Sequence, residues 1–148
     1  MIFLAQIFGK FGWNSRLLTE ADFYRICRRE RIKIVEYPLE SSPGFYMVCN
    51  GRHFITIDSR LRGVRRMYVL WHELAHYFLH VPPHANSVRW FQLKPNTREE
   101  LEAEAFAVIA LIPEPLLRRM LSSEIEDEYG YTREMLNFRL KVLDLYGI

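Results

Sequence analysis

The sequence predicts an α+β fold in which a small antiparallel β-sheet packs on a helical bundle. Two apolar runs, Phe45–Cys49 and His53–Ile57, flank the pair Asn50-Gly51. Asn-Gly readily adopts positive φ at both central positions of a type I′ turn, so these runs are expected to form a β-hairpin. Two long segments with helical spacing of apolar residues follow the hairpin. Strands followed by a run of helices are typical of an α+β domain.

The segment before the hairpin is expected to supply one helix and one strand. Residues 15–30 have helical spacing, with Thr19 as a candidate N-cap. Residues 32–37, Ile-Lys-Ile-Val-Glu-Tyr, are typical of a strand. Ser-Ser-Pro-Gly at 41–44 then predicts a turn.

The first long helix is predicted over residues 62–80, with Asp58 and Ser59 available to cap it. Residues 81–96 contain three prolines and are expected to be irregular, with a short turn at Val88–Phe91.

The second long helix is predicted to begin at Thr97 and to run to Leu111. Pro113 and Pro115 end it and can open another short helix, because proline is tolerated in a first turn. The acidic segment 122–130 is expected to be a loop. Thr132 should begin a last helix that ends near Gly147.

Length and charge limit the classes of protein to consider. A chain of 148 residues fits a single domain, 1–148, with one core. Its net charge of +2 is too small to indicate nucleic-acid binding by itself. Basic residues nevertheless form two groups, which are either solvated faces or a patch for an acidic partner. The groups are Arg25, Arg28, Arg29, Arg31 and Lys33, and Arg60, Arg62, Arg65 and Arg66.

Cysteine use and the N-terminus indicate a soluble cytoplasmic chain. Cys27 and Cys49 stand alone without a CxxC motif, which excludes a cysteine-only zinc site and favours two apolar residues over a disulfide. The apolar run Met1–Phe8 is short and is followed by Lys10, unlike a secretory signal. No stretch approaches the roughly eighteen apolar residues of a membrane helix.

The decisive motif is H-E-x-x-H at His72, Glu73 and His76. Four residues turn an α-helix through about 400°, so the two imidazoles lie about 40° apart and can reach one tetrahedral Zn²⁺. Glu73 projects beside them and can take a proton from a zinc-activated water and pass it to a leaving amine. The alternative is a core helix that carries two histidines by chance. The apolar residues that flank the motif disfavour a chance occurrence, because burying imidazole and carboxylate groups in a core costs free energy unless they have a function there.

A third histidine, His80, continues the four-residue spacing. The drift of about 40° per step carries it around the helix, and an extended three-histidine motif would need histidine at Pro82. We therefore expect His80 to lie at the helix end or to support a ligand.

The third metal ligand is expected from the helix that begins at Thr97. Glu100 and Glu104 lie four residues apart on one face of it. However, Thr97-x-x-Glu100 is also a capping box, in which the glutamate bonds back to the threonine amide. Spacing alone leaves both roles of Glu100 open.

These motifs resemble the ImmA/IrrE family of metallo-endopeptidases. The resemblance rests on H-E-L-A-H-Y-F-L-H at 72–80 and E-x-E-A-x-x-F-A-x-x-x-L-I-P at 100–113, and it extends over about residues 15–146. It implies a minimal thermolysin-like zincin whose Zn²⁺ is held by His72, His76 and Glu100, the last placed six residues before Phe106. Glu104 stands where the family often has asparagine, which makes it a supporting group or a rival ligand. Glu102 is the weakest candidate.

The resemblance implies a zinc endopeptidase that cleaves a helix-turn-helix transcriptional repressor, with Glu73 as general base. One alternative is a non-proteolytic zinc-containing module that sequesters a transcriptional regulator. The intact Glu73 disfavours it, because a pure binder has no need of a base. A nucleic-acid-binding protein that uses the arginine groups is a further alternative, supported by no recognisable motif.

Two features of substrate binding can be assigned only as candidates. The run His53–Ile57 could be an edge strand that pairs with an extended peptide, or an ordinary hairpin strand. Tyr77, His84 and Arg89 lie near enough in sequence to stabilise an oxyanion, and none of the three is assigned.

Overall fold

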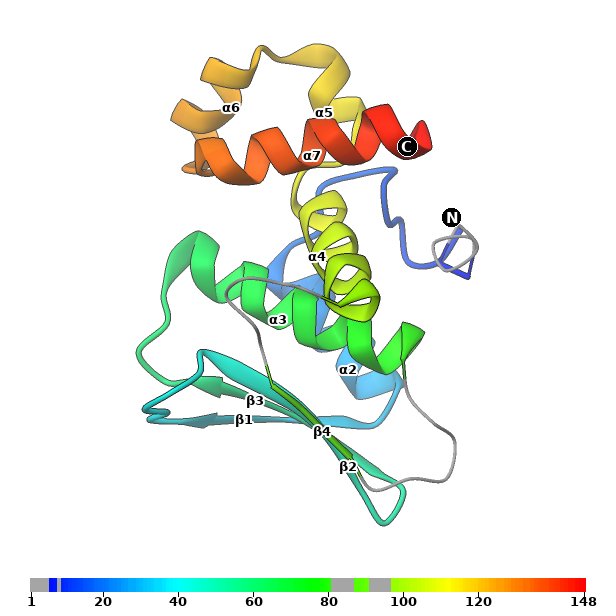
Figure 1. Cartoon of the computed structure of the whole chain (residues 1–148), viewed down its shortest axis with the longest axis vertical. Coiled ribbons are helices and arrows are strands. Elements are labelled where there is room, and N and C mark those ends of the chain that lie inside the picture. The colour runs from blue at the N-terminus through cyan, green and yellow to red at the C-terminus, as the bar shows by residue number, and fades with distance from the viewer. Residues whose placement is uncertain (1–5, 8, 81–86, 91–96) are drawn as a thin grey trace.

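The computed structural model describes residues 6–7, 9–80, 87–90 and 97–148 and confirms the α+β fold. A four-stranded sheet forms one layer, and the helices α2 (Glu20–Arg29) and α3 (Gly63–Leu79) lie against it (Figure 1). Helix α4 (Arg98–Leu111) crosses α3 on the side away from the sheet. Three further helices follow it in the chain: α5 (Glu114–Arg119), α6 (Ser122–Tyr129) and α7 (Arg133–Tyr146).

The sheet is mixed, whereas the sequence predicted an antiparallel one. Its strands are β1 (Ile32–Tyr37), β2 (Gly44–Cys49), β3 (Arg52–Asp58) and β4 (Ser87–Trp90), in the order β1-β3-β2-β4. The β2–β3 hairpin is confirmed, with φ of 50° at Asn50 and 73° at Gly51. The chain reverses between β1 and β2 but leaves the width of one strand between them. Strand β3 fills this space and therefore runs parallel to β1.

This strand order decides between the two alternatives for His53–Ile57 in favour of an ordinary hairpin strand. Strand β3 pairs with β1 on one side and with β2 on the other, so it lies inside the sheet. Its backbone groups are already used in the ladder and cannot pair with an extended peptide. Residues 87–90, predicted as part of a turn at Val88–Phe91, instead add β4 to the sheet beside β2. Phe91 lies outside the described residues, as do Pro82, Pro83 and Pro95.

Several helix boundaries differ from those predicted. Helix α2 begins after Thr19, whose hydroxyl accepts a hydrogen bond from the Asp22 amide, and so it is shorter than 15–30. Asp58 does not cap α3. Its carboxylate instead binds the backbone and guanidinium of Arg60 in the turn before the helix.

The acidic segment 122–130 forms helix α6, so the predicted loop is wrong. The Glu124 carboxylate accepts a hydrogen bond from the Leu121 amide at the start of the helix, and Ile125 is fully buried. Gly130, with φ of 71°, ends it in the left-handed conformation. The acidic composition of the segment predicted a loop. The helix instead depends on the cap formed by Glu124 and on the burial of Ile125, which composition does not reveal.

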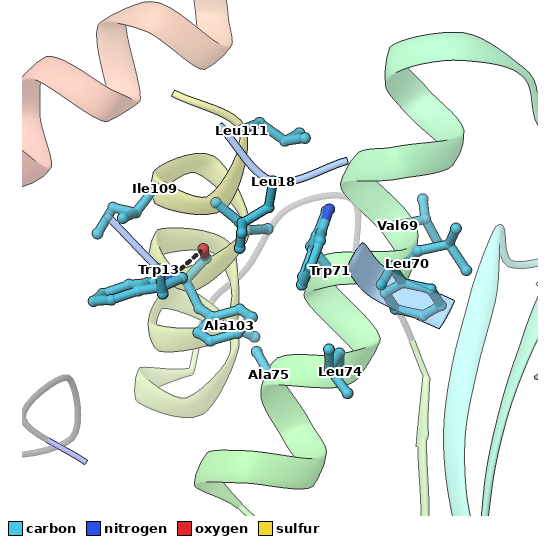
Figure 2. Packing of buried hydrophobic residues seen from close by; sticks show 14 of the residues in the cluster. Trp13, Leu18, Val69, Leu70, Trp71, Leu74, Ala75, Ala103, Ile109 and Leu111 are labelled. Carbon is cyan, nitrogen blue, oxygen red and sulfur yellow. Dashed lines mark hydrogen bonds between the residues drawn. The ribbon is translucent and has the colours of Figure 1, made fainter. Parts of the chain in front are cut away.

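The core lies where α3 and α4 cross (Figure 2). Trp71 of α3 and Phe106 of α4 are both fully buried, and the Trp13 indole donates a hydrogen bond to the Phe106 carbonyl at 3.1 Å. Ala75 and Ala103, also fully buried, lie on the facing sides of the two helices. Because a methyl group adds little bulk, the helices can approach closely here. This contact fixes α4 against the His72–His76 face of α3.

Candidate metal centre

Helix α3 places His72, Glu73 and His76 together in the interior. Their exposed fractions are 1%, 0% and 0%, which is rare for such residue types. The two imidazole centroids lie 5.1 Å apart, one helical turn from each other. The apolar remainder of the helix, packed against the sheet and α4, holds this polar group inside the molecule.

Helix α4 brings the carboxylate of Glu100 to both histidines. Its Oε2 lies 3.1 Å from His72 Nε2, and its Oε1 lies 3.3 Å from His76 Nε2. Donor atoms of these three residues all lie within 4.8 Å of one another. In the part of the chain that the structure describes, this is the one group of histidine, cysteine and acidic side chains with the geometry to hold a metal ion.

These residues fit a divalent transition metal. Two imidazoles and one carboxylate are the donor set of hydrolytic zinc sites, which leave a position open for water or substrate. The two carboxylate oxygens of Glu73 are buried and form no hydrogen bond within the described residues. An unsatisfied buried carboxylate costs free energy unless a further group comes to it. The site is thus built for a partner that the polypeptide alone does not supply.

The pKa shifts of His72, Glu100 and Glu73 agree with a site that binds a metal ion. Burial lowers the pKa of His72 despite the nearby Glu100 carboxylate, which keeps the imidazole neutral and able to bind metal. Burial works against ionisation of Glu100, but the adjacent His72 and His76 imidazoles outweigh it and lower its pKa to about 2. Burial, together with the charge of Glu100, raises the pKa of Glu73 well above its ordinary value.

The structure separates the two roles that the sequence left open for Glu100. The Thr97 hydroxyl accepts a hydrogen bond from the Glu100 amide at 3.2 Å, so Thr97 does cap α4. The Glu100 carboxylate, however, lies against His72 and His76. The backbone of this residue therefore belongs to the helix cap, and its side chain belongs to the candidate metal-binding group.

The neighbouring acidic residues on α4 have other partners. Glu104 is hydrogen-bonded with Tyr68, and its pKa is raised mainly by burial. Glu102 Oε2 lies 2.9 Å from His80 Nε2, and the other nitrogen of His80, Nδ1, lies 2.9 Å from His76 Nδ1. His80 thus caps the end of α3 and contacts a predicted ligand, as expected from its place in the sequence.

The candidates for an oxyanion donor remain unassigned. The hydroxyl of Tyr77 donates a hydrogen bond to Glu30, at the end of α2, at 2.9 Å. His84 and the side chain of Arg89 lie outside the described residues.

Gly44 is a residue of the site that the sequence reading missed. A Cβ added there would lie 2.9 Å from Val69 Cγ1, 3.1 Å from the Thr56 carbonyl oxygen and 3.6 Å from Glu73 Oε1. A side chain at residue 44 would collide with Val69 and crowd the Thr56 carbonyl, so the start of β2 can pack this closely against α3, beside Glu73, only because residue 44 is glycine. The sequence predicts that Pro43-Gly44 belongs to a turn. No local pattern distinguishes a glycine needed for a turn from one that allows the backbone to pack closely against a neighbouring helix.

The arginine groups and the cysteines do not add to the site. Arg66 is largely buried and pairs with Glu20 and Glu36, while Arg60 pairs with Asp58, so part of the second basic group serves internal contacts. Both cysteines are free, Cys27 buried and Cys49 exposed. No helix within the described ranges is long and apolar enough to cross a membrane.

Comparison with known proteins gives one match. The profile of the peptidase family M78, described as the IrrE N-terminal-like domain, matches residues 27–141. This range contains β1 to β4, both helices of the metal centre and most of α7. Neither the curated proteins nor the solved structures give a match.

Proposed function

The chain belongs to the IrrE N-terminal-like family of M78 peptidases, and from this premise we propose that it is a zinc-dependent endopeptidase. The observation that carries the proposal is the buried group of His72, His76 and Glu100, with the unsatisfied carboxylate of Glu73 beside it. His72 and His76 would bind Zn²⁺ through Nε2, and Glu100 through its carboxylate. When bound, the metal supplies Lewis-acid activation of a water and of the scissile carbonyl.

Glu73 supplies the proton transfer. Its carboxylate accepts a proton from the attacking water and delivers it to the amine that leaves when the peptide bond breaks. Burial raises the pKa of Glu73, which makes its carboxylate a stronger base than an exposed one. A module that only binds and sequesters a regulator would gain nothing from burying this unsatisfied group.

We further propose that the substrate is a helix-turn-helix transcriptional repressor. This assignment follows the resemblance of the two metal-site motifs to the ImmA/IrrE family. The identity of the substrate is the most specific part of the proposal, and it is tested separately from metal-dependent peptide hydrolysis.

The test uses the purified chain and helix-turn-helix repressors encoded beside its own gene. The wild type should hold about one zinc per chain and cleave a repressor in a chelator-sensitive reaction. His76→Ala should lose both the metal and the cleavage.

Glu73→Gln is the matched control, because its amide keeps the shape of the side chain but cannot act as a base. It should retain zinc and lose cleavage. Cleavage by Glu73→Gln at the wild-type rate would refute the mechanism. Equal zinc content in the wild type and His76→Ala would refute the site. A stable repressor complex without any cleavage would favour the sequestering module.

A further inference from the structure

A line of hydrogen bonds leads from the candidate ligand His76 to the surface of α4. His76 Nδ1 lies 2.9 Å from His80 Nδ1, and His80 Nε2 lies 2.9 Å from Glu102 Oε2. Arg98 Nε donates to the other oxygen of Glu102, Oε1, at 2.6 Å. The line joins the end of α3 to the first turns of α4, which lie side by side (Figure 1).

We propose that Glu102 and His80 are positioning residues that fix the tautomer of His76 required for metal binding. The inference rests on the proposed metal site and adds to it two residues that do not touch the metal. The two side chains are only 9% and 4% exposed, so water competes little for these hydrogen bonds.

The direction of each hydrogen bond follows from the chemistry of Glu102, which lies at the end of the line away from His76. Paired with the Arg98 guanidinium, Glu102 acts as a carboxylate, which can only accept. His80 must therefore donate its Nε2–H to Glu102. We take His80 as neutral, in which case its other nitrogen carries a lone pair and His80 Nδ1 accepts from His76 Nδ1–H. The His76 proton is thereby placed on Nδ1, and Nε2, the atom facing Glu100, is left with its lone pair for the metal.

The opposite arrangement would disable the site. If His80 donated from Nδ1, His76 Nδ1 would have to accept, and the His76 proton would lie on Nε2. That nitrogen could then donate to Glu100 but could not bind a metal ion. The network thus selects the binding tautomer over a competing hydrogen bond inside the same site. Groups that orient a ligand in this way typically account for a factor of about 10 to 100 in metal affinity.

Two substitutions at one position separate this role from a purely structural one. His80→Ala and His80→Asn both remove the partner of Glu102, so both should lose similar amounts of stability. Only asparagine keeps an acceptor, its Oδ1, at the place of the histidine Nδ1, although its amide nitrogen can also turn there and donate. We expect His80→Ala to weaken zinc binding about 10-fold to 100-fold and His80→Asn to recover part of that loss. Equal zinc affinities for the two variants, or wild-type affinity for His80→Ala, would overturn the proposal.

A second measurement needs neither metal nor substrate. Long-range ¹H–¹⁵N NMR of the metal-free protein distinguishes a protonated ring nitrogen from one with a lone pair. We expect His76 in the wild type to be protonated at Nδ1, with Glu102→Gln showing a mixture of tautomers because an amide can donate as well as accept. Glu134→Gln removes an exposed carboxylate on α7 and serves as the control. Protonation of wild-type His76 at Nε2 would overturn the proposal, whether or not the chain proves to be a peptidase.

Discussion

At the scale of single residues, the backbone of Glu100 takes part in the helix cap, whereas its side chain takes part in the candidate metal centre. The amide bonds to Thr97 Oγ1, whereas the carboxylate lies within 3.3 Å of one nitrogen of each histidine. These two contributions can be removed independently, because Thr97 supplies the cap and Glu100 supplies the charge.

We therefore expect Glu100→Gln and Thr97→Ala to give opposite results. The glutamine is a poor substitute for an anionic ligand, so zinc affinity and activity should fall steeply while metal-free thermal stability stays close to wild type. Thr97→Ala should cost about 1 kcal/mol of stability and leave zinc affinity nearly unchanged.

The measurements are zinc titration and thermal unfolding in chelator. Glu104→Gln, which removes a carboxylate one turn along the same helix, should cause a smaller defect than Glu100→Gln. Normal zinc binding by Glu100→Gln together with a severe defect in Glu104→Gln would assign the third ligand to Glu104.

The site residues differ in how far local sequence could predict them. Helical geometry alone places His72, Glu73 and His76 on one face, and the structure has them there. Glu100 could not be distinguished from Glu104 by spacing, because the choice depends on how α4 crosses α3. Glu102 is the weakest ligand candidate in the sequence, and the structure places its carboxylate against His80 rather than in the candidate metal-binding group. Its partner His80 lies 22 residues away on another helix, and no local pattern reports that contact.

At the scale of elements, the sheet shows the same contrast between features that adjacent residues determine and features that distant segments determine. The β2–β3 hairpin depends on two adjacent residues, Asn50 and Gly51, and was predicted from them. The insertion of β3 between β1 and β2 depends on pairing between segments that are not adjacent in the chain, and the sequence did not predict it. Parallel pairing of β1 with β3 leaves no local signal, because it joins segments that are separated in the chain by β2.

The start of α2 shows how a short motif controls an element. Thr19 Oγ1 accepts from the Asp22 amide, and the Asp22 carboxylate accepts from the Thr19 amide at 2.8 Å and from Arg16. The hydrogen bond from Arg16 and those from Thr19 lower the pKa of Asp22 despite its burial. Because its pKa is lower in the folded chain than in the unfolded one, ordinarily about 3.9, folding is stabilised where the group is ionised.

We expect Asp22→Asn to lower the free energy of unfolding by about 1 kcal/mol at pH 7. This stability is fully present above the unfolded pKa and is lost as the pH falls through the lower folded pKa. The difference between wild type and variant should therefore be constant above about pH 5 and should narrow below about pH 4. Urea unfolding across this range measures it, with exposed Asp144→Asn as control. A gap that widens on acidification would contradict the assignment.

At the scale of the whole molecule, Arg139 connects three parts of the chain. It is fully buried in α7 and donates to the Ile112 carbonyl at 2.6 Å, the Ile148 carbonyl at 2.7 Å and Asn14 Oδ1 at 3.2 Å. Burial lowers its pKa to about 10, which still leaves the guanidinium charged at neutral pH. The segment before α2, the end of α4 and the end of the chain thus meet at one side chain.

Replacing Arg139 should test whether this junction holds the molecule together without taking part in the metal site. Arg139→Met removes the donor to the Ile112 and Ile148 carbonyls, at about 1–3 kcal/mol each, whereas Asn14 Oδ1 keeps its hydrogen bond from the Glu114 amide, so a total loss of roughly 2 kcal/mol or more is expected. Arg139→Lys keeps the charge but cannot reproduce the planar fork that reaches all three acceptors, so its loss should be intermediate. Below the unfolding temperature both variants should bind zinc with near wild-type affinity, because the hydrogen bonds of Arg139 among the described residues go to Ile112, Ile148 and Asn14 and not to the candidate metal ligands. Calorimetric unfolding and zinc titration on the same samples measure the two quantities. Weakened zinc binding by fully folded Arg139→Lys would show instead that the α4–α7 junction sets the position of Glu100.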